Sequence, residues 1–405
     1  MTFMKRVLRP LVPALAVTLA FSLAPAPSAT ATTEALAQAG ALLGEHHPTT
    51  LLVKVAAGHD PQRIHRRAGF AVLNRIRPLG IDVVRVPEGG IVAALRRYGE
   101  MPAVDYAEPN YILRLAAMPN DDMAPDQYAL RSIRAPRAWQ RYGRPWRARG
   151  GARIAIIDSG IDRLHPEFAG RITHCRSGLA GIGAAVPGCQ DVQVHGTHVT
   201  GIAAAAANNS IGIAGVAFDA EIMALQAFNT SGQALNADVL AAMVYAAQNG
   251  ADVANYSFGG RTDSQAQRDA VRLAARRGIV QVAAAGNTGT AGVDFPARLG
   301  RVIAVAATDD NDARAGFSSF GRTVELAAPG DLVLSTVPGS VLYMRMSGTS
   351  MAAPHVAGLA ALLRAKGYTP AQTRRRLRTS ARDLGPEGRD REFGYGLVNA
   401  ARSLR

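Results

Sequence analysis

From Tyr128 onward, the sequence alternates between short apolar runs and longer segments with a helical pattern of apolar residues. The apolar runs cover residues 153–158, 221–228, 252–258, 279–286 and 301–307. The helical patterns between them cover residues 195–207, 236–250 and 264–278. Apolar runs of this kind are typical of strands that are buried on both faces. Because they alternate with helices, we predict an α/β fold with a parallel central sheet and helices on both faces.

Ligands of such sheets bind at the carboxyl ends of the strands. Asp158 ends the first predicted strand, and Asn287 follows the fourth in the stretch AAAGN. His195 begins a predicted helix rich in glycine and alanine, which suits close packing against a sheet. Taken singly, aspartate and asparagine are common turn residues at such places. His195 and His198 are three residues apart and lack the HExxH pattern, which argues against a zinc site.

Residues 345–363, RMSGTSMAAPHVAGLAALL, predict a turn that leads into a long buried helix. Proline is tolerated only near the start of a helix, so Pro354 places that start close to Ser350. The Ser350 hydroxyl would lie at the positive end of the helix dipole, where free N–H groups can face an oxyanion. His355 is five residues further on, about 140° around the helix, and points away from Ser350. An isolated serine here is usually a helix cap.

Five stretches occur in order along the second part of the chain: IAIIDSGIDRLHP, HGTHVTG, YSFGG, AAAGN and SGTSMAAPHVAG. Together they resemble the subtilisin-like serine proteases (subtilases, peptidase family S8), in which the triad follows in the order Asp, His, Ser. The resemblance covers residues 128–404 and includes FGYGLVNAARSL at the end. The stretch PND at 119–121 resembles the start of the thermitase-like branch of this family.

The resemblance implies a serine endopeptidase that acts through an acyl-enzyme. Ser350 would attack the scissile carbonyl, and His195 would act as general base and then as general acid. Asp158 would orient the imidazole and stabilise its protonated form. The Ser350 backbone N–H and the Asn287 side chain would bind the oxyanion. The histidines expected to pack structurally are His198 and His355.

The substrate-binding residues that the resemblance implies are Ser257, Phe258, Gly259, Gly286, Gly348 and Asp294. The first three belong to a strand that would pair with the substrate backbone, and the glycines would allow close approach. Asp294 would lie near the base of the pocket for the side chain before the cut. A buried carboxylate there favours arginine or lysine. The alternative is that Asp294 turns outward and caps a turn.

A structural calcium ion is also implied, with Asp121, Glu167 and Asn209 as its protein ligands. Residues 208–217, NNSIGIAGVA, resemble the calcium loop of the family, and carboxylate and amide oxygens are hard donors suited to calcium. Glu167 stands where the family more often has aspartate. The alternative is that Asn208 and Asn209 only cap the preceding helix. The resemblance implies no cofactor for the chemistry itself.

Residues 1–31 are predicted to be a signal peptide. A positively charged start precedes an apolar stretch at 11–24 that is too short to span a bilayer comfortably. Removal of this segment would give a secreted protein, extracellular or periplasmic. An uncleaved membrane anchor is the alternative. Because export exposes a chain to oxidising conditions, Cys175 and Cys189 can form a disulfide or remain as two free thiols.

Residues 32–116 combine strand and helix patterns and predict a small α+β unit. VDYAEPNY at 104–111 resembles the closing strand of the inhibitory propeptide of the family. A stretch rich in proline, asparagine and aspartate follows and marks a domain boundary. We therefore expect a zymogen that cuts itself after Ala116 and releases a catalytic domain at 117–405. Until then, the propeptide would be an intramolecular inhibitor.

The formal net charge of +14, nearly all from arginine, raises the alternative of nucleic-acid binding. The arginines are scattered, however, and only TRRRLR at 373–378 is dense, which favours a solvated helix face. A catalytically silent subtilase fold that serves as a binding scaffold is a further alternative, but all three triad residue types are present. We expect a monomer that binds protein or peptide substrates and its own propeptide, with no nucleic acid and no stable membrane span.

Overall fold

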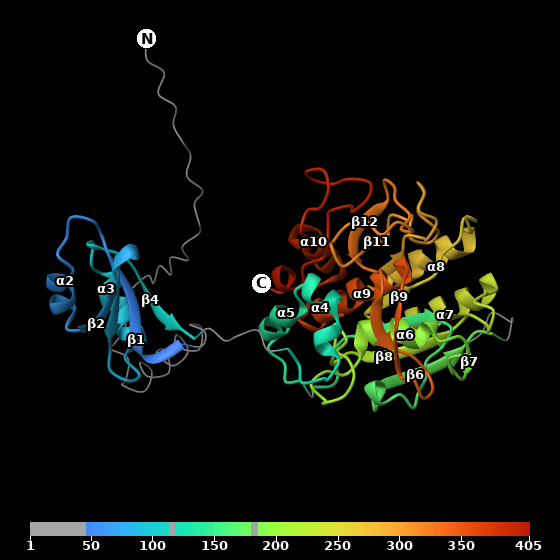
Figure 1. Cartoon of the computed structure of the whole chain (residues 1–405), viewed down its shortest axis with the longest axis horizontal. Coiled ribbons are helices and arrows are strands. Elements are labelled where there is room, and N and C mark those ends of the chain that lie inside the picture. The colour runs from blue at the N-terminus through green and yellow to red at the C-terminus, as the bar shows by residue number, and fades with distance from the viewer. Residues whose placement is uncertain (1–45, 113–117, 147, 180–184) are drawn as a thin grey trace, which may run out of the picture. The chain divides into compact units, whose positions relative to one another are not determined.

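The computed structural model describes residues 46–112, 118–146, 148–179 and 185–405. The chain forms two compact units, Met1–Leu115 and Ala116–Arg405 (Figure 1). The predicted signal peptide and the predicted cut after Ala116 lie outside the described residues.

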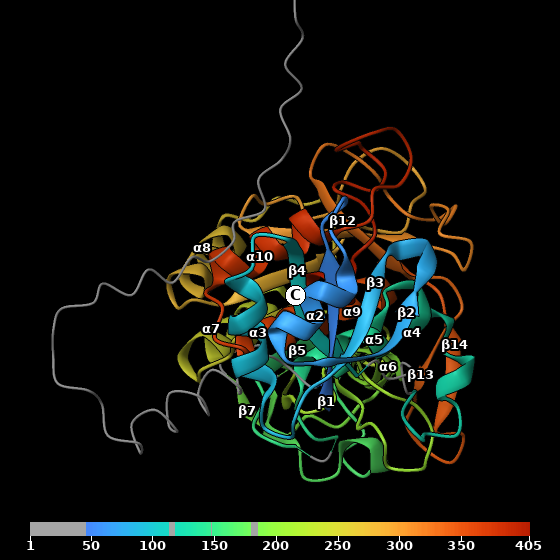
Figure 2. The same ribbon diagram turned by 90° about the vertical axis from the view of Figure 1, so that its left-hand side faces the viewer.

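The smaller unit is a four-stranded antiparallel sheet, in the order β2-β3-β1-β4, with two helices on one face. Its elements are β1 (His46–Val55), α2 (Pro61–Ala68), β2 (Ala71–Ile76), the 3₁₀ helix η1 (Arg77–Leu79), β3 (Ile81–Arg85), α3 (Ile91–Gly99) and β4 (Val104–Tyr111). In Figure 2 the helices lie in front of the strands. Along β1, Leu51 and Val53 are buried against Ala94 and Tyr98 of α3. The predicted α+β unit is confirmed.

The larger unit contains an eight-stranded sheet in the order β12-β11-β10-β9-β5-β8-β6-β7, in which only the β6–β7 pair is antiparallel. Its strands are β5 (Arg153–Asp158), β6 (Ile172–Ser177), β7 (Val186–Pro187), β8 (Glu221–Gln226), β9 (Val253–Tyr256), β10 (Val280–Ala284), β11 (Val302–Thr308) and β12 (Val324–Pro329). A separate antiparallel pair consists of β13 (Val333–Thr336) and β14 (Tyr343–Met346).

Eight α-helices and two 3₁₀ helices accompany these strands in the described part of the larger unit. They are η2 (Ala124–Asp126), α4 (Tyr128–Ser132), α5 (Ala135–Tyr142), η3 (Pro166–Phe168), α6 (His195–Ala204), α7 (Asn236–Gln248), α8 (Gln265–Arg276), α9 (Thr349–Ala365), α10 (Pro370–Ser380) and α11 (Ala400–Ser403). None of the helices that the structure describes is both long enough and apolar enough to pass through a bilayer.

The central sheet is buried on both faces, which explains its continuous apolar runs. In β5, Ile154 and Ile156 face a core that includes α6 and α9. The alternate residues Ala155 and Ile157 face a second core that includes α7 and α8. Side chains of a strand point alternately to opposite faces, so a strand between two helical layers needs apolar residues at every position. The predicted parallel sheet with helices on both faces is confirmed.

The first turn of α9 is held by the sheet as well as by its own backbone. Pro354 is the sixth residue of α9 and has no N–H to donate to the carbonyl of Ser350, four residues earlier. The hydroxyl of Ser257, which follows β9, donates to that carbonyl instead, at 2.8 Å. The predicted helix start near Ser350 is therefore correct. Pro354, however, lies beyond the first turn, where a residue normally needs its N–H for a helical hydrogen bond.

Cys175 and Cys189 form a disulfide that joins β6 to the segment before α6. Cys189 is buried in the core that lies beneath α6, and the partly buried Cys175 packs against the same core. Of the two possibilities that the sequence leaves open, the structure therefore has the disulfide.

Candidate active site

Asp158 and His195 form a hydrogen-bonded pair at the carboxyl edge of the sheet. Asp158 is the last residue of β5 and is 3% exposed, and His195 is the first residue of α6. The Nδ1 atom of His195 lies 2.7 Å from Oδ1 of Asp158, so the Nδ1–H group donates to the carboxylate. This bond selects the tautomer in which the other ring nitrogen, Nε2, is free to accept a proton.

The charge on Asp158 also changes the acidity of the histidine. Burial lowers the pKa of His195, but the nearby carboxylate of Asp158 outweighs this effect, and the pKa is raised above its ordinary value. Asp191 raises it in the same sense. A histidine with this pKa is a better proton acceptor than an unpaired one, which suits a general base.

Ser350 lies in the first turn of α9 and is 9% exposed. Its hydroxyl donates to the carbonyl of Ser257 at 3.0 Å. Among the described residues, no hydrogen bond joins Ser350 to His195. Catalytic hydrogen bonds are often loose without substrate, and a rotation of the serine side chain would redirect its hydroxyl. The structure nevertheless places Ser350, His195 and Asp158 around one cavity of about 380 Å³.

Asn287 lines the same cavity, and its orientation is set by Thr349. The side-chain oxygen of Asn287 accepts hydrogen bonds from the backbone N–H of Thr349, at 2.8 Å, and from its hydroxyl, at 2.9 Å. The fully buried Thr349 hydroxyl also accepts the N–H of Gly286, at 3.1 Å. With its oxygen occupied, Asn287 can offer its NH₂ group to a ligand. Sequence reasoning missed Thr349, although it stands next to Ser350 in the GTS stretch.

Five of the six predicted substrate-binding residues line this cavity, and one does not. The residues that line it are Ser257, Phe258, Gly259, Gly286 and Asp294. Gly348 lies beside Asn287 and is not among the lining residues. The lining residues that the sequence did not suggest are Ser159, Gln193, Phe228, Gly232, Ala284, Thr288 and Thr349.

Asp294 faces the cavity on one side and an arginine on the other. Its Oδ1 atom is buried, forms no hydrogen bond with a described residue and lies 3.5 Å from Nε of Arg261. Its other oxygen packs so closely on Gly286 that a Cβ at Gly286 would lie 2.6 Å from it. Gly286 also has φ +114°, so a glycine is required there on both counts. Burial raises the pKa of Asp294, and Arg261 and Arg298 oppose the shift.

His198 and His355 lie in the core, away from the cavity, and are held by backbone carbonyls. Nε2 of His198 is 3.1 Å from the carbonyls of Val333 and Met344. Nδ1 of His355 is 2.9 Å from the carbonyl of Met351. Burial lowers the pKa of both rings to about 4, so both are neutral at pH 7. His198 therefore turns toward the β13–β14 pair and does not share a ligand position with His195.

The three predicted calcium ligands lie together. Two oxygens of Asp121 accept the N–H groups of Asn208 and Asn209, at 2.8 and 3.1 Å. Glu167 is fully buried and accepts the Asn209 amide at 2.9 Å and the Tyr343 hydroxyl at 3.1 Å. Burial raises the pKa of Asp121, and it raises the pKa of Glu167 to about 7. No ion pair with a residue in the described ranges compensates either carboxylate.

The sequence of this chain matches a known protease family over most of the larger unit. Residues 149–396 match the subtilase family (peptidase S8). The chain belongs to the subtilase family. Residues 32–110 match the fervidolysin N-terminal prodomain, so a prodomain precedes the catalytic domain.

Three similar proteins are proteases of this family. Thermophilic serine proteinase of Bacillus sp. (strain AK1) is 38% identical over 313 residues, which are 77% of this chain and 75% of that protein. Thermitase of Thermoactinomyces vulgaris is 40% identical over 71% of this chain and 99% of its own. Subtilisin Savinase of Lederbergia lenta is 40% identical over 63% of this chain and 91% of that protein. This subtilase is a serine endopeptidase of the thermitase-like type, made with a prodomain.

Replacing Thr349 with valine tests whether Thr349 orients Asn287. The variant keeps the branched shape but removes one of two hydrogen bonds to the Asn287 oxygen, together with the acceptor of the Gly286 N–H. We therefore expect kcat to fall about two- to tenfold, with a smaller change in KM. Steady-state kinetics on a peptide substrate measures this. Asn287→Ala is the comparison and should lower kcat by about 10²–10³ fold. An unchanged kcat in Thr349→Val, beside a fall in Asn287→Ala, would contradict the orienting role.

Proposed function

We propose that Asp158, His195 and Ser350 are the catalytic triad of this serine endopeptidase, which acts through an acyl-enzyme. The observation that carries the proposal is the 2.7 Å hydrogen bond between His195 and Asp158 at the cavity that Ser350 also lines. An acid that orients a histidine, and a hydroxyl within the reach of that histidine, are the parts that such a nucleophile requires.

The reaction begins when the Ser350 hydroxyl turns from the carbonyl of Ser257 to Nε2 of His195. His195 takes the proton while Oγ attacks the substrate carbonyl, and Asp158 stabilises the resulting imidazolium. His195 then gives the proton to the leaving amine, and the acyl-enzyme forms. Water, deprotonated by the same histidine, then attacks the ester. The bond to Oγ breaks, His195 returns the proton to Ser350, and the second product leaves.

The oxyanion of each tetrahedral intermediate is bound by the NH₂ group of Asn287 and the backbone N–H of Ser350. Both donors are fixed before substrate arrives, because Thr349 occupies the oxygen of Asn287 and Ser350 belongs to the first turn of α9. Donors that need no reorganisation stabilise the developing charge more than water does.

The protease is secreted and processes itself. In this proposal, residues 1–31 are a signal peptide, 32–116 an inhibitory propeptide and 117–405 the catalytic domain. The match of residues 32–110 to a prodomain of this family supports the second assignment. The chain between the two units would be cut by the same serine that later cuts substrates. Tethering raises the effective concentration of that segment and compensates for a poor side chain before the cut.

Ser350→Ala should abolish proteolysis and leave an uncut precursor. The loss of a triad nucleophile costs several orders of magnitude in rate. The precursor is expressed without other proteases and its mass is measured beside that of wild type, while a fluorophosphonate probe reports the nucleophile in the wild-type protein. A mature-sized Ser350→Ala product would contradict self-processing, and labelling of a residue other than Ser350 would contradict the triad.

Asp294 gives the protease a preference for arginine or lysine before the cut. One oxygen of its carboxylate is engaged by Arg261, and the other lies toward Gly286 and Gly259 in the walls of the cavity. A cationic side chain entering the cavity would meet this second oxygen in a partly desolvated place, where an ion pair is stronger than in water.

Asp294→Asn tests this preference with peptides that differ only in arginine or leucine before the cut. We expect kcat/KM for the arginine peptide to fall about tenfold or more, because one partner of a partly buried charge pair is lost. The leucine peptide serves as the internal control and should change little. An equal ratio of kcat/KM for the two peptides in both enzymes would show that Asp294 caps its own turn and does not contact the substrate.

A calcium ion stabilises the catalytic domain at Asp121, Glu167 and Asn209. The fit rests on two buried carboxylates, Asp121 and Glu167, which are hard oxygen donors and lie beside Asn209. The Asn209 amide presents its nitrogen to Glu167, so its oxygen would reach an ion only after the amide turns. The ion would act as the cationic partner of these two carboxylates. It takes no part in the chemistry.

Removal of calcium with a chelator should lower the melting temperature of the mature protease. An ion present at about 100 times its Kd stabilises a fold by about 2.7 kcal/mol. Differential scanning calorimetry measures the loss, and readdition of calcium should reverse it. In Glu167→Gln, which removes one carboxylate charge, chelator should have a smaller effect. A melting temperature that does not respond to chelator in wild type would favour the simple helix cap.

A further inference from the structure

Asp191 is a buried carboxylate, four residues before His195, with no role in the triad described above. It is 8% exposed. Its Oδ1 atom accepts the Ser159 hydroxyl at 2.8 Å and the N–H groups of Gln193 and Val194 at 2.9 and 3.0 Å. Asp191 therefore connects the residue after Asp158 to the residue before His195.

The second oxygen of Asp191 binds the first turn of α6. It accepts the N–H and the hydroxyl of the fully buried Thr197, at 2.9 and 2.5 Å. The first N–H groups of a helix have no partner within the helix, and a negative charge near them is favoured by the helix dipole. The N-cap residue of this helix, Val194, makes no side-chain cap bond, and Asp191 binds the first turn in its place.

Val194, directly before His195, has a strained backbone that Asp191 helps to hold. Its φ is +76°, a left-handed conformation that is unfavourable for a branched side chain. Such strain persists only where the surroundings impose it, and it gathers at functional sites. The hydrogen bond from the Val194 N–H to Asp191 is one of the contacts that impose it here.

Ser159 completes the connection between the sheet and the helix. Its hydroxyl donates to Asp191 and accepts the N–H of Gly196, at 2.9 Å, while its own N–H donates to Asp158, at 2.8 Å. The end of β5 and the start of α6 therefore share one buried network. A displacement of Asp191 would alter the placement of Asp158 and His195 together.

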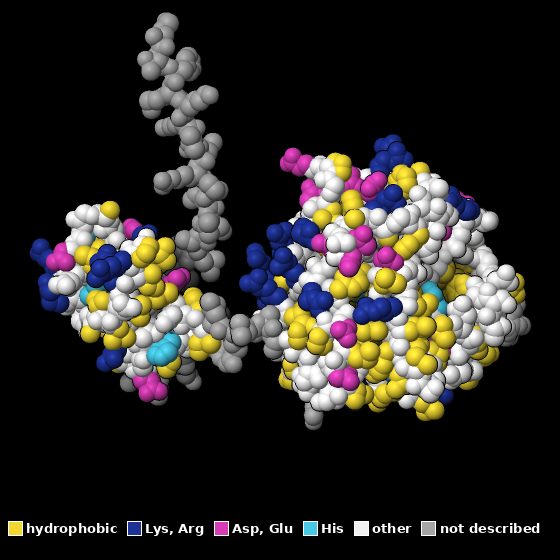
Figure 3. Space-filling view, viewed as in Figure 1, with side chains coloured by type: hydrophobic (Ala, Val, Ile, Leu, Met, Phe, Trp, Pro, Cys, Tyr) yellow, Lys and Arg dark blue, Asp and Glu magenta, His cyan; other side chains and the backbone are white. Residues whose placement is uncertain are grey.

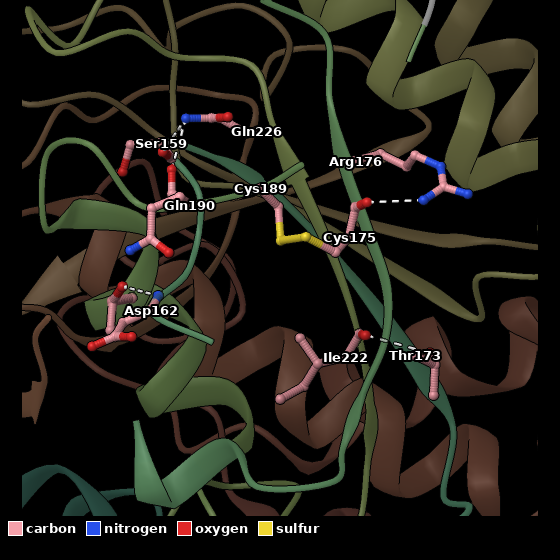
Figure 4. Close-up of a disulfide and its surroundings, with 10 residues drawn as sticks. Ser159, Asp162, Thr173, Cys175, Arg176, Cys189, Gln190, Ile222 and Gln226 are labelled. Carbon is pink, nitrogen blue, oxygen red and sulfur yellow. Dashed lines mark hydrogen bonds between the residues drawn. A yellow bond between two sulfur atoms is a disulfide. The ribbon is translucent and has the colours of Figure 1, made fainter. Parts of the chain in front are cut away.

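The disulfide holds the segment that leads into this network. Cys189 is two residues before Asp191, and its carbonyl accepts the N–H of Ile161 at 2.8 Å. The carbonyl of Gln190, next to the disulfide in Figure 4, accepts the Gln226 amide at 2.8 Å. A Cβ at Gly160 would lie 2.6 Å from both of these carbonyl oxygens. The backbone of residues 189–190 is therefore tightly packed against the residues that follow Asp158.

We propose that Asp191 is a positioning residue for the Asp158–His195 pair, and that the Cys175–Cys189 disulfide anchors the segment that carries it. This inference rests on the proposed roles of Asp158 and His195. Asp191 touches neither substrate nor the reacting atoms, and it acts through Ser159 and the first turn of α6.

The charge of Asp191 gives its role a signature that packing alone would not produce. The carboxylates that face His195 are Asp158, from β5, and Asp191, from the segment before α6, and both raise its pKa against the opposite effect of burial. The nearest ring on its own helix, His198, is neutral at pH 7. Removing the charge of Asp191 therefore lowers the pKa of His195, and the acid limb of kcat/KM moves to lower pH.

The test compares Asp191→Asn with wild-type mature protease over a range of pH. We expect kcat to fall about 10- to 100-fold, because small misplacements of catalytic groups have effects of this size. KM should change less than kcat, because Asp191 does not line the cavity itself, although its partners Ser159 and Gln193 do. The acid limb should move to lower pH. Asp269→Asn, at an exposed site on α8, is the matched control and should leave kcat and the limb unchanged.

Two further variants separate position from charge. Ser159→Ala keeps the charge of Asp191 but breaks its link to the end of β5, so kcat should fall while the acid limb stays in place. The double variant Cys175→Ala with Cys189→Ala should behave in the same way. These variants decide the matter if Asp191→Asn does not fold, as judged by circular dichroism.

His195→Ala distinguishes failure of the inference from failure of the proposed function. An active His195→Ala enzyme would overturn the triad and, with it, the role of Asp191. If His195→Ala is inactive but folded Asp191→Asn and Ser159→Ala both keep the kcat and pH profile of wild type, the triad stands and the positioning role of Asp191 is overturned. A fall in kcat without a shift of the acid limb in Asp191→Asn would overturn the electrostatic part.

Discussion

The parallel register of β5, β9 and β10 is the constraint on which the rest of the site depends. Asn255 of β9 is the partner of Ile156 in β5 and of Val282 in β10, so the three strands end at one edge. Asp158, at the end of β5, and Asn287, just after β10, reach the same cavity for this reason. A slip of one residue in either pairing would turn every side chain of a strand to the opposite face. The site therefore requires the whole sheet to form correctly.

Much of this could be predicted from the sequence, because buried strands and the ends of elements leave local patterns. The central strands read as apolar runs, of which Asp158 ends one and Asn287 follows another. Strand β12 was missed because it contains Glu325, whose buried carboxylate is paired with arginines of α10 some fifty residues away. The contact of Thr349 with Asn287 also joins distant segments. A local pattern carries no signal of such partners, whereas the fold supplies them.

The hydrogen bonds between Ser257 and Ser350 join the first turn of α9 to the end of β9, at the place where α9 lacks one of its own hydrogen bonds. Pro354 leaves the Ser350 carbonyl without its helical donor, and the Ser257 hydroxyl replaces that donor. The Ser350 hydroxyl in turn donates to the Ser257 carbonyl. The first turn of α9 is thus bonded in both directions to the end of β9. The backbone of Ser350 is thereby held relative to the sheet, on which Asp158 and Asn287 also depend, while its hydroxyl can still rotate toward His195.

The net charge of the chain gives a misleading picture of the field at the site. Lysine and arginine side chains are densest on one side of the larger unit in Figure 3. A second hollow is lined by Arg134, Arg137, Arg141, Arg382, Arg402 and Arg405. The active-site cavity, in contrast, is lined by Asp158 and Asp294, and the lining residues that the structure describes include no lysine or arginine. A cavity surrounded by low-dielectric walls concentrates the field of the charges that line it. The walls of the cavity thus do not share the net charge of +14, although Asp158 pairs with His195 and Asp294 pairs with Arg261.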